Sequence, residues 1–389
     1  MRTQVCIVGG GPSGLLVGQL LHRAGIDTIV LERRSRAHVL ARIRAGVLED
    51  GLCDLLRRAG VGDRMDREGF RHTGTVLAAA GREFRIDFQA LTGRSVMVYG
   101  QTEVTHDLYA ARDEAGGTTL HEIDDVAIEG VDTAAPAVTF RQNGAARRIA
   151  CDFVAGCDGF HGVSRRTIPR AVRREYERVY PFGWLGVLSE TPPVNDELIY
   201  ANHERGFALC SMRHENLSRY YVQVPLDDSV AGWPDSRFWD ELRARLPARI
   251  AEALVTGPSV EKSIAPLRSF IAEPMRWGRL FLAGDAAHIV PPTGAKGLNL
   301  AASDIHYLSE ALIAHYAGDG DGLLDNYSDR ALARVWKASR FSWSLTTLMH
   351  RFPDQGAFGQ RMQEAELNWL EHSTAAQTAL AENYVGLPY

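Results

Sequence analysis

The first residues whose spacing suggests chemistry are Gly9, Gly11 and Gly14, which form a G-x-G-x-x-G pattern near the start of the chain. Ser13 stands where a helical periodicity begins, and Glu32 ends the next strand-like run. Glycines let a backbone approach a pyrophosphate, a helix N-terminus offers free N–H groups, and a carboxylate can hold a ribose. This context predicts a dinucleotide site, although a plain tight turn gives the same spacing.

Acidic residues end two further strand-like runs, Asp158 the run 150–158 and Asp285 the run 279–285. Because open α/β sheets bind ligands at the carboxyl ends of their strands, both aspartates are candidates for the same site. Arg42 and Arg44 form a repeated R-x-R beyond the glycine loop. Their fork-shaped cations suit a pyrophosphate, which favours a functional role over that of solvated surface arginines.

The run 284–299 resembles the Gly-Asp motif of flavoprotein aromatic hydroxylases, in which the aspartate holds the ribitol of FAD and the next helix points at the flavin ring. Asp158 and Gly159, with Ser164 and Arg165 or Arg166 downstream, resemble the family's Asp-Gly motif. The long form of this motif, at 158–162, is similar to the branch that hydroxylates 4-hydroxybenzoate. The resemblance extends over essentially the whole chain, through the runs 42–49, 99–104, 199–203, 205–211 and 382–389.

The resemblance implies a set of residues in contact with FAD. The set is Gly9, Gly11, Ser13, Gly14, Glu32, Arg42, Ile43, Arg44, Ala45, Gly46, Val47, Gln101, Asp158, Arg219, Asp285, Leu298 and Asn299. A helix that begins near Gly297 offers N–H groups to an anionic flavin. Such donors lower the cost of negative charge on the reduced ring.

For the substrate, the resemblance implies Tyr200, Ser211, Met212, Arg213, Tyr221 and Pro292. Arg213 would pair with a carboxylate in a bidentate geometry, and the hydroxyls of Ser211 and Tyr221 would add hydrogen bonds. Met212 stands where the family has glutamine. On a strand, however, its side chain points to the face opposite that of Ser211 and Arg213. A phenolic acid fits such a site.

The resemblance also implies the residues of catalysis, Tyr200, Tyr384, His72 and Pro292. The two tyrosines and His72 would carry the proton of the substrate phenol to solvent, which makes the ring carbon beside the oxygen electron-rich. Taken alone, a tyrosine on a strand is more often a core residue, and a lone histidine is more often on the surface or satisfied in the core.

For the nicotinamide coenzyme, the implied residues are Arg33, Arg34, Arg44, His161 and Arg268. Arg33, Arg34 and Arg36 form a basic cluster directly after Glu32. The cluster can meet a 2′-phosphate or be solvated, so the choice between NADPH and NADH stays open.

The elements that must position these residues begin with a β-α-β unit over residues 5–31. Between about 178 and 266 the sequence turns to aromatic and β-branched runs, such as 219–224, which are typical of an inserted sheet. Helical periodicity dominates from 298 to about 383. We expect an α/β (α+β) fold with a Rossmann-like FAD-binding domain at 1–177, its return segment at 267–297, an inserted mixed β-sheet substrate domain at 178–266, and a helical interface region at 298–389.

The composition is that of an ordinary globular protein. The chain has 389 residues, of which 45% are hydrophobic and 23% charged, and a net charge of −5. This gives no basic field for nucleic acid or an anionic membrane, and no apolar stretch approaches the roughly 18 residues of a membrane span. Five cysteines without a C-x-x-C pair predict reduced structural thiols and no metal site. With no secretory signal pattern at the N-terminus, a cytoplasmic enzyme is expected.

We therefore expect an FAD-dependent monooxygenase of aromatic hydrocarbon catabolism that converts 4-hydroxybenzoate to 3,4-dihydroxybenzoate with NADPH or NADH and O2. We expect a homodimer, and the sequence does not determine how its two subunits are arranged. One alternative is another hydroxybenzoate as substrate, because an apolar pocket rejects an added hydroxyl poorly. Two more distant alternatives are a flavin-dependent halogenase, although the chain has no W-x-W-x-I-P run, and a non-catalytic flavoprotein.

Overall fold

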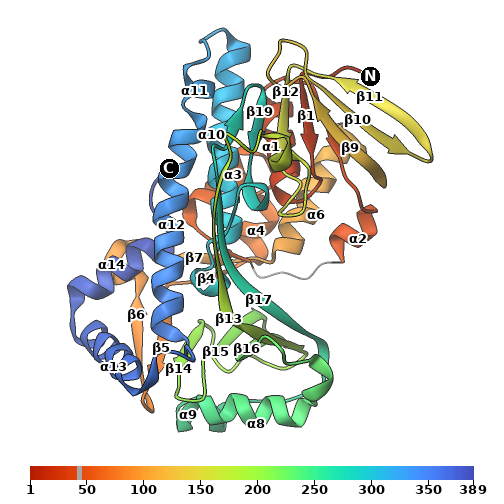
Figure 1. The fold of residues 1–389 in the computed structure, drawn as a ribbon. Helices are drawn as coiled ribbons and strands as arrows, with labels where there is room; N and C mark the ends of the chain where they lie inside the picture. Colours follow the sequence, from red (N-terminus) through yellow and green to blue (C-terminus); the bar gives the residue numbers. More distant parts are fainter. Residues whose placement is uncertain (42–45) are drawn as a thin grey trace.

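The computed structural model describes residues 1–41 and 46–389, and one of its layers is a six-stranded sheet of order β18-β19-β12-β1-β2-β8 (Figure 1). The strands from β19 to β8 run parallel, and β18 is antiparallel to β19. They are β1 (Val5–Val8), β2 (Thr28–Leu31), β8 (Thr118–Leu120), β12 (Phe153–Gly156), β18 (Arg276–Trp277) and β19 (Leu280–Leu282). The predicted β-α-β start and the two predicted strands before Asp158 and Asp285 are confirmed.

Helix α1 (Pro12–Arg23) packs between α6 (Gln101–Glu114) and α10 (Gly297–Ala317). Pro12 at the first helical position starts α1 without the loss of a hydrogen bond, because the N–H there has no intrahelical partner. Leu15, Leu16 and Leu20 of this helix are buried in the core shared with the sheet. The glycine loop is thus held between a buried strand and a buried helix.

A second, eight-stranded sheet has the order β20-β17-β13-β16-β15-β14-β5-β6. Its strands are β5 (Gly74–Ala79), β6 (Arg82–Asp87), β13 (Arg174–Ser189), β14 (Ile199–Asn202), β15 (Ala208–His214), β16 (Leu217–Pro225), β17 (Ser259–Glu273) and β20 (His288–Ile289). The strands predicted around Tyr200 and over residues 219–224 are confirmed as β14 and β16. Helices α8 (Asp235–Arg245) and α9 (Ala248–Ala253) lie against one face of this sheet (Figure 1).

The long strands β13 and β17 pair with each other and run from the region of the first sheet into the second (Figure 1). The predicted domain boundaries at 177/178 and 266/267 fall inside these two strands. The β5–β6 hairpin comes early in the chain but extends the second sheet through the parallel pairing of β5 with β14. The division into four segments stays a prediction.

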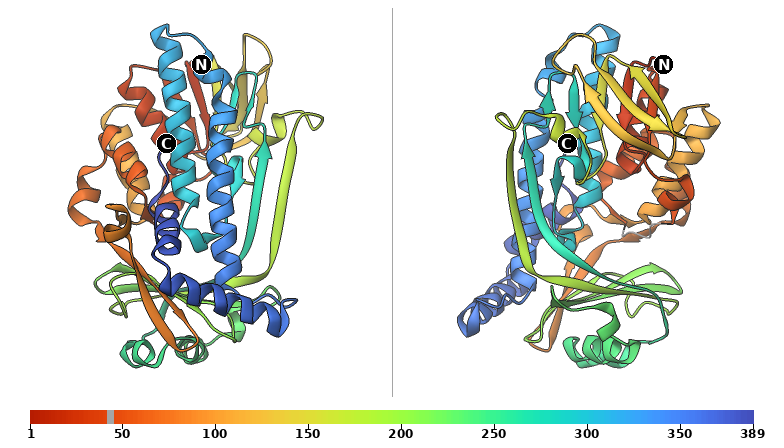
Figure 2. Two further views of the ribbon diagram at one scale, coloured as in Figure 1. Left: turned by 90° about the vertical axis from the view of Figure 1, so that its left-hand side faces the viewer. Right: turned by 45° about the vertical axis from the view of Figure 1, so that its right-hand side comes forward.

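The C-terminal part is helical, as predicted, and it covers both sheets. It contains α10, α11 (Gly322–Asp325), α12 (Tyr327–Met349), α13 (Gly356–His372) and α14 (Thr374–Val385). Helix α12 spans the length between the two sheets, while α13 projects from the body of the molecule (Figure 2). Together with the parallel sheet and the inserted sheet, these helices confirm the predicted fold class.

The remaining elements form two small sheets and several short helices. They are α2 (Arg36–Leu40), β3 (Val47–Leu48), α3 (Asp50–Arg58), α4 (Asp63–Glu68), β4 (Phe70–His72), α5 (Phe88–Thr92), β7 (Val96–Val98), β9 (Ile123–Glu129), β10 (Ala137–Gln142), β11 (Ala145–Ala150), α7 (Ser164–Thr167), η1 (Val230–Gly232), η2 (Gly284–Ala286) and η3 (Pro292–Gly294). Among the described residues no helix has the length and apolarity needed to cross a membrane, and no cluster of three or more ligating side chains could hold a metal.

Candidate active site

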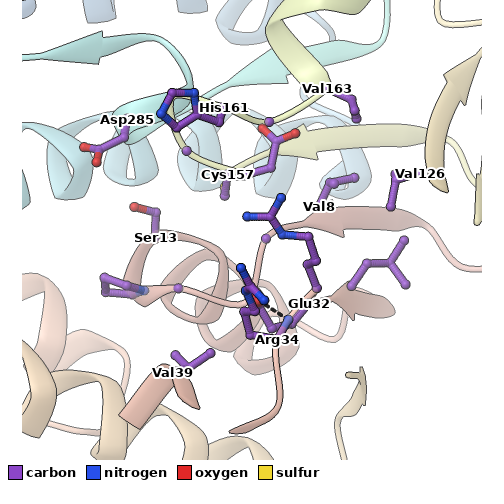
Figure 3. A pocket seen from close by; sticks show the side chains of 18 of the residues that line it. Val8, Ser13, Glu32, Arg34, Val39, Val126, Cys157, His161, Val163 and Asp285 are labelled. Carbon is purple, nitrogen blue, oxygen red and sulfur yellow. Dashed lines mark hydrogen bonds between the residues drawn. The ribbon is translucent and has the colours of Figure 1, made fainter. Parts of the chain in front are cut away.

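A cavity of about 900 Å³ opens where the strands of the parallel sheet end (Figure 3). Many residues predicted for FAD or for the coenzyme line it. They are Gly9, Gly11, Ser13, Glu32, Arg33, Arg34, Gln101, Asp158, His161, Asp285 and Leu298. The structure therefore gathers around one space residues as far apart in the sequence as Gly9 and Leu298, and their individual roles stay predictions.

The three glycines of the loop meet different surroundings. A Cβ atom at Gly9 would lie 2.2 Å from the carbonyl oxygen of Cys157, and one at Gly14 would lie 1.9 Å from the carbonyl oxygen of Gly9. Gly9 also has a φ of +111°, which side chains disfavour. A Cβ at Gly11 would meet no atom within 4 Å. Gly9 and Gly14 thus permit the tight turn, and Gly11 leaves its backbone open toward the cavity.

The carboxylate of Glu32 is already engaged with the loops around it. Its Oε2 accepts from the backbone N–H of Gly10 at 2.8 Å, and its Oε1 accepts from the backbone N–H of Arg34 at 2.7 Å. Each carboxylate oxygen keeps a further lone pair. Glu32 can therefore fix the loop and still accept from a ribose hydroxyl.

Asp158 follows β12 and lines the cavity. Its Oδ2 accepts from the backbone N–H of Ser164 at 2.9 Å, while its Oδ1 is buried without a partner among the described residues. Burial raises the pKa of Asp158. A Cβ at Gly162 would lie 2.0 Å from the Asp158 carboxyl carbon, so the close turn requires glycine there. The unpartnered oxygen is a ready acceptor for a polar ligand.

Asp285 is exposed toward the cavity, where Figure 3 places it with His161 on the side opposite Glu32. Its turn, η2, is fixed from behind by Asp304, whose Oδ2 accepts from the Gly284 N–H at 2.8 Å and lies 2.6 Å from His288 Nε2. Burial lowers the pKa of His288, but the charge of Asp304 and this hydrogen bond raise it more, and the net shift is upward. A buried ion pair thus supports the turn that presents Asp285.

The start of α10 faces the cavity through Gly297 and Leu298. Asn299 does not line the cavity: its Oδ1 accepts from the Glu49 N–H at 2.9 Å, and its Nδ2 donates to the Val47 carbonyl at 2.9 Å. Gly46 is required because a Cβ there would lie 1.9 Å from the Tyr99 carbonyl oxygen. Asn299 and the segment at 46–47 therefore hold α10 in place.

Four of the predicted FAD residues, Arg42, Ile43, Arg44 and Ala45, lie outside the described residues. Of the others, Arg219 is away from the cavity and pairs with Glu261, with nitrogen and oxygen atoms 3.1 Å apart. Its predicted contact with FAD stays untested.

Three of the predicted substrate residues, Tyr200, Ser211 and Tyr221, lie on one face of the second sheet. Tyr200 is opposite Leu209, and Leu209 is opposite Tyr221, so the three side chains share a face. The side chain of Ser211 points to the same face as Leu209. The side chains of Met212 and Cys210 point to the opposite face. Tyr200 and Leu209 belong to the core shared with α12 and α14, whereas Cys210 packs toward α8.

Arg213 is partly buried and has no carboxylate partner among the described residues. Its Nη1 donates to Ser211 Oγ at 3.0 Å, and it hydrogen-bonds the Tyr221 hydroxyl. Its Nε is buried without a partner. A Cβ at Gly186 would lie 2.8 Å from the Tyr221 ring, so glycine makes room for that ring. The arrangement leaves a cation with free donor capacity, as a site for an anion requires.

The hydroxyls of Tyr200 and Tyr384 lie 2.8 Å apart, although the two residues come from β14 and α14. Both side chains are buried, and burial raises the pKa of Tyr200 well above its usual value and that of Tyr384 to about 12. Both are therefore neutral near pH 7 and can each donate and accept. Tyr384 also hydrogen-bonds the hydroxyl of Thr75.

His72 is buried at the end of β4, and burial lowers its pKa. Neither of its ring nitrogens has a hydrogen-bond partner among the described residues, and no direct bond joins it to Tyr200 or Tyr384. Buried polar groups of this kind are commonly bridged by water. The structure thus brings together two members of the predicted relay and leaves the third as a prediction.

The other predicted residues lie at the edges of the site. Pro292 begins η3 and is exposed, and the hydroxyl of the neighbouring Thr293 is hydrogen-bonded to that of Thr346 at 2.9 Å. His161 lines the cavity, whereas Arg268 does not. The Arg268 guanidinium lies 4.7 Å from the centre of the Phe160 ring and is ion-paired to Glu177 at 3.1 Å.

Some residues at the site were not predicted from the sequence. The cavity is also lined by His38, Val39, Asp124, Asp125 and Val126, and by Arg166, which the sequence places in the Asp-Gly motif. Lys296, inside the recognised run 284–299, donates to Glu49 Oε1 at 2.6 Å and to the Tyr384 carbonyl at 2.8 Å, and Arg334 donates to Glu49 Oε2 at 2.8 Å. This buried ionic cluster ties the start of α10 to the segment that carries Tyr384. Its signal in the sequence was a lysine within a glycine-rich motif.

Comparison with known proteins agrees with this geometry. A family model described as FAD binding domain matches residues 2–342. The chain is 58% identical over 390 residues to the p-hydroxybenzoate hydroxylase of Acinetobacter baylyi, covering 100% of this chain and 96% of that protein. It is 27% identical to the para-nitrophenol 4-monooxygenase of a Pseudomonas species, over 83% of this chain and 81% of that protein. The structure of p-nitrophenol 4-monooxygenase from Pseudomonas putida superposes with a TM-score of 0.79 at 21% identity and full coverage of both chains, which shows a shared fold.

Proposed function

The chain belongs to the FAD-binding family of flavoprotein aromatic hydroxylases, and we propose that it hydroxylates 4-hydroxybenzoate at the 3-position with NADPH or NADH and O2. The product is 3,4-dihydroxybenzoate. The observation that carries this choice of substrate is the face formed by Arg213, Ser211 and Tyr221 at one part of the sheet and by Tyr200 at another. A cation and a phenol-binding hydroxyl on one face suit a molecule with a carboxylate and a phenol.

The residues around the cavity fit FAD. The open backbone at Gly11 suits a pyrophosphate, the free lone pairs of Glu32 and Asp158 suit ribose and other hydroxyls, and the start of α10 offers N–H groups to an anionic ring. Asp285 would hold the ribitol chain. Bound FAD supplies the redox and oxygen chemistry of the reaction.

The chain's own part in the reaction is to bind, orient and deprotonate the substrate. Arg213 holds the carboxylate, with Ser211 and Tyr221 as hydrogen-bonding neighbours. The Tyr200 hydroxyl accepts the hydrogen bond of the phenol, and the proton passes through the Tyr384 hydroxyl, 2.8 Å away, toward solvent. The apolar surroundings keep bulk water from the reacting ring.

The test of this proposal is identification of the product. The holoenzyme is incubated with NADPH and 4-hydroxybenzoate, and the product is identified by mass and NMR. We expect 3,4-dihydroxybenzoate and faster turnover than with 3-hydroxybenzoate or 3,4-dihydroxybenzoate itself. A different benzoate turned over faster, or NADPH oxidation without an oxygenated product from any of them, would contradict the proposed substrate.

We propose NADPH as the preferred coenzyme because Arg33 and Arg34 are exposed on the cavity and have no carboxylate partner among the described residues. The double variant Arg33→Gln and Arg34→Gln is expected to raise the KM for NADPH about tenfold more than that for NADH, since a lost charge-assisted bond to the 2′-phosphate costs about 1.5 kcal/mol. The measurement is steady-state kinetics with both coenzymes.

A matched control for these arginines is the double variant Arg147→Gln and Arg148→Gln, which removes two exposed arginines from β11. It should leave both KM values unchanged. An equal loss for NADPH and NADH in the Arg33 and Arg34 variant would show that these arginines are solvated or serve the fold.

We also propose a cytoplasmic location for the protein. Its five free cysteines are consistent with a reducing compartment.

We also propose that the protein is a homodimer and that α13 contributes to the contact. Phe358, Met362 and Trp369 of this helix are 75%, 51% and 55% exposed and follow one another at helical spacing. Such a stripe of large apolar side chains marks an interaction surface, and Figure 2 shows the helix projecting from the body.

Replacing Phe358 and Trp369 by glutamate is expected to convert the dimer into a monomer, because each protomer would bring two like charges into the contact. Size-exclusion chromatography with light scattering measures the mass. The control is Val260→Glu, which places a charge at another exposed apolar residue, 58% exposed on β17. A dimer that persists in the α13 variant would rule out this surface, and a monomeric parent would rule out the dimer.

A further inference from the structure

His350 lies at the end of α12 with a fully buried side chain. Its Nε2 is 2.7 Å from Trp184 Nε1, and its Nδ1 is 3.0 Å from the Thr346 carbonyl oxygen. An indole N–H can only donate, so Nε2 must accept and Nδ1 must carry the proton that the carbonyl accepts. Burial lowers the pKa of His350 to about 3. The histidine is therefore a neutral ring held in one tautomer.

The His350 ring is stacked against the aromatic layer beneath the predicted substrate residues. Its centre lies 4.2 Å from that of Phe207 and 5.7 Å from that of Trp184. Phe207 in turn contacts Tyr200 at 6.2 Å between ring centres, and Trp184 contacts Tyr221 at 5.0 Å. One side chain thus supports both tyrosines.

The same turn of α12 reaches a third part of the site. The hydroxyls of Thr346 and Thr293 are hydrogen-bonded at 2.9 Å, and Thr293 is next to Pro292 in η3. The backbone carbonyl of Thr346 accepts from His350 Nδ1. The positions of the Pro292 turn, of Tyr200 and of Tyr221 are therefore linked through two residues one helical turn apart.

We propose that His350 is a positioning residue, which sets the orientation of Tyr200 and Tyr221 relative to the Pro292 turn through its hydrogen bond with Trp184. This rests on the proposed function, because those residues are its predicted substrate contacts. An apolar residue could fill the same space, but it would leave the buried Trp184 N–H without an acceptor. The indole would then turn to find another partner and shift the Tyr221 ring packed on it.

The experiment compares His350→Phe, His350→Gln and Trp184→Phe in the FAD-loaded enzyme. The phenylalanine variants keep a ring but break the hydrogen bond, and we expect product formed per NADPH consumed to fall about threefold to tenfold in each, since a lost buried hydrogen bond costs roughly a factor of this size. Glutamine can accept from Trp184 and donate to Thr346, and His350→Gln should retain most of the coupling. FAD affinity should stay within twofold in all three.

A double variant, Trp184→Phe with His350→Phe, tests whether the two residues act through one bond. Its coupling should be no worse than that of the poorer single variant, because the bond is already lost there. The control is Trp239→Phe, which removes another buried indole bond, to the Gly257 carbonyl at 2.9 Å, on the α8 side of the sheet. That variant should lower the melting temperature and leave coupling unchanged.

Two results would overturn the inference. One is a set of variants that lose thermal stability but stay fully coupled, which would make His350 a packing residue only. The other is an additive loss in the double variant, which would separate the two residues. The parent enzyme decides the proposed function independently: a parent that forms no dihydroxybenzoate overturns that function and this inference with it, whereas a coupled parent with coupled variants overturns the inference alone.

Discussion

Arg213→Ala is expected to raise the dissociation constant of 4-hydroxybenzoate by a factor of about 30 to several thousand, which corresponds to roughly 2–5 kcal/mol. The reason is that the guanidinium has no carboxylate partner among the described residues and one buried nitrogen without a partner. Burial lowers its pKa, which reflects the cost of keeping a cation there. A bound carboxylate would offset that cost, and removing the cation would leave the carboxylate unpaired.

The measurement is titration of the FAD-loaded variant with 4-hydroxybenzoate, followed by the change in flavin absorbance. Arg213→Lys is the conservative variant, and it should lie between parent and alanine because lysine keeps the charge but loses the fork. The uncharged analogue 4-hydroxybenzamide should bind parent and alanine variants with similar affinity. Binding of 4-hydroxybenzoate to Arg213→Ala within a factor of three of the parent would show that the carboxylate lies elsewhere.

The glycine loop was the part of the site most open to prediction, because its chemistry is local. Gly9, Gly11 and Gly14 lie in one short loop, and the close contact at Gly14 is with the Gly9 carbonyl, although the contact at Gly9 is with the carbonyl of Cys157 after β12. Asp158 and Asp285 were predicted to reach the same place because parallel strands end at one edge, and they do line one cavity. In these cases the secondary-structure element that carries a residue, and the end at which the residue stands, determine which residues lie near it in the fold.

Other parts depend on contacts between distant segments, which neither periodicity nor spacing encodes. The β5–β6 hairpin joins the second sheet only because β14, more than a hundred residues later, offers an edge to β5. Asn299 matches a recognised motif, yet its side chain binds Val47 and Glu49. His350 gave no signal in the sequence, since its proposed role depends on a hydrogen bond with Trp184 of the distant strand β13.

The contact between Tyr200 and Tyr384 could be predicted only in part. The resemblance named both residues, and the fold places their hydroxyls in contact by packing α14 on the sheet, where Tyr384 also stacks on Phe88 with ring centres 4.7 Å apart. Lys296 binds the Tyr384 carbonyl and so fixes the start of α10 relative to it. The position of Tyr384 is thus determined by three separate elements.

Tyr200→Phe is expected to lower product formed per NADPH consumed by about tenfold to a hundredfold and to release hydrogen peroxide instead. Phenylalanine keeps the ring packing but removes the hydroxyl that, in the proposed relay, stabilises the substrate phenolate and passes the phenol proton to Tyr384. A hydrogen bond to the charged form lowers the pKa of a bound phenol, so its loss should move the phenol titration to higher pH. General acid–base groups commonly contribute factors of about 10²–10⁴ to a reaction rate. The ratio of product formed to NADPH consumed reports only part of such a loss.

The measurements are the ratio of dihydroxybenzoate to NADPH, the peroxide yield, and the ultraviolet spectrum of the bound phenol as pH rises. Tyr384→Phe should act in the same direction but more mildly, because the first hydrogen bond survives. Tyr220→Phe is the matched control: this tyrosine is also buried in the same sheet, but on the α8 side, away from Tyr200 and Tyr384. It should stay fully coupled, and FAD binding should be intact in all three. Full coupling with an unchanged phenol titration in Tyr200→Phe would refute the relay, while the flavoenzyme itself would remain established by its family.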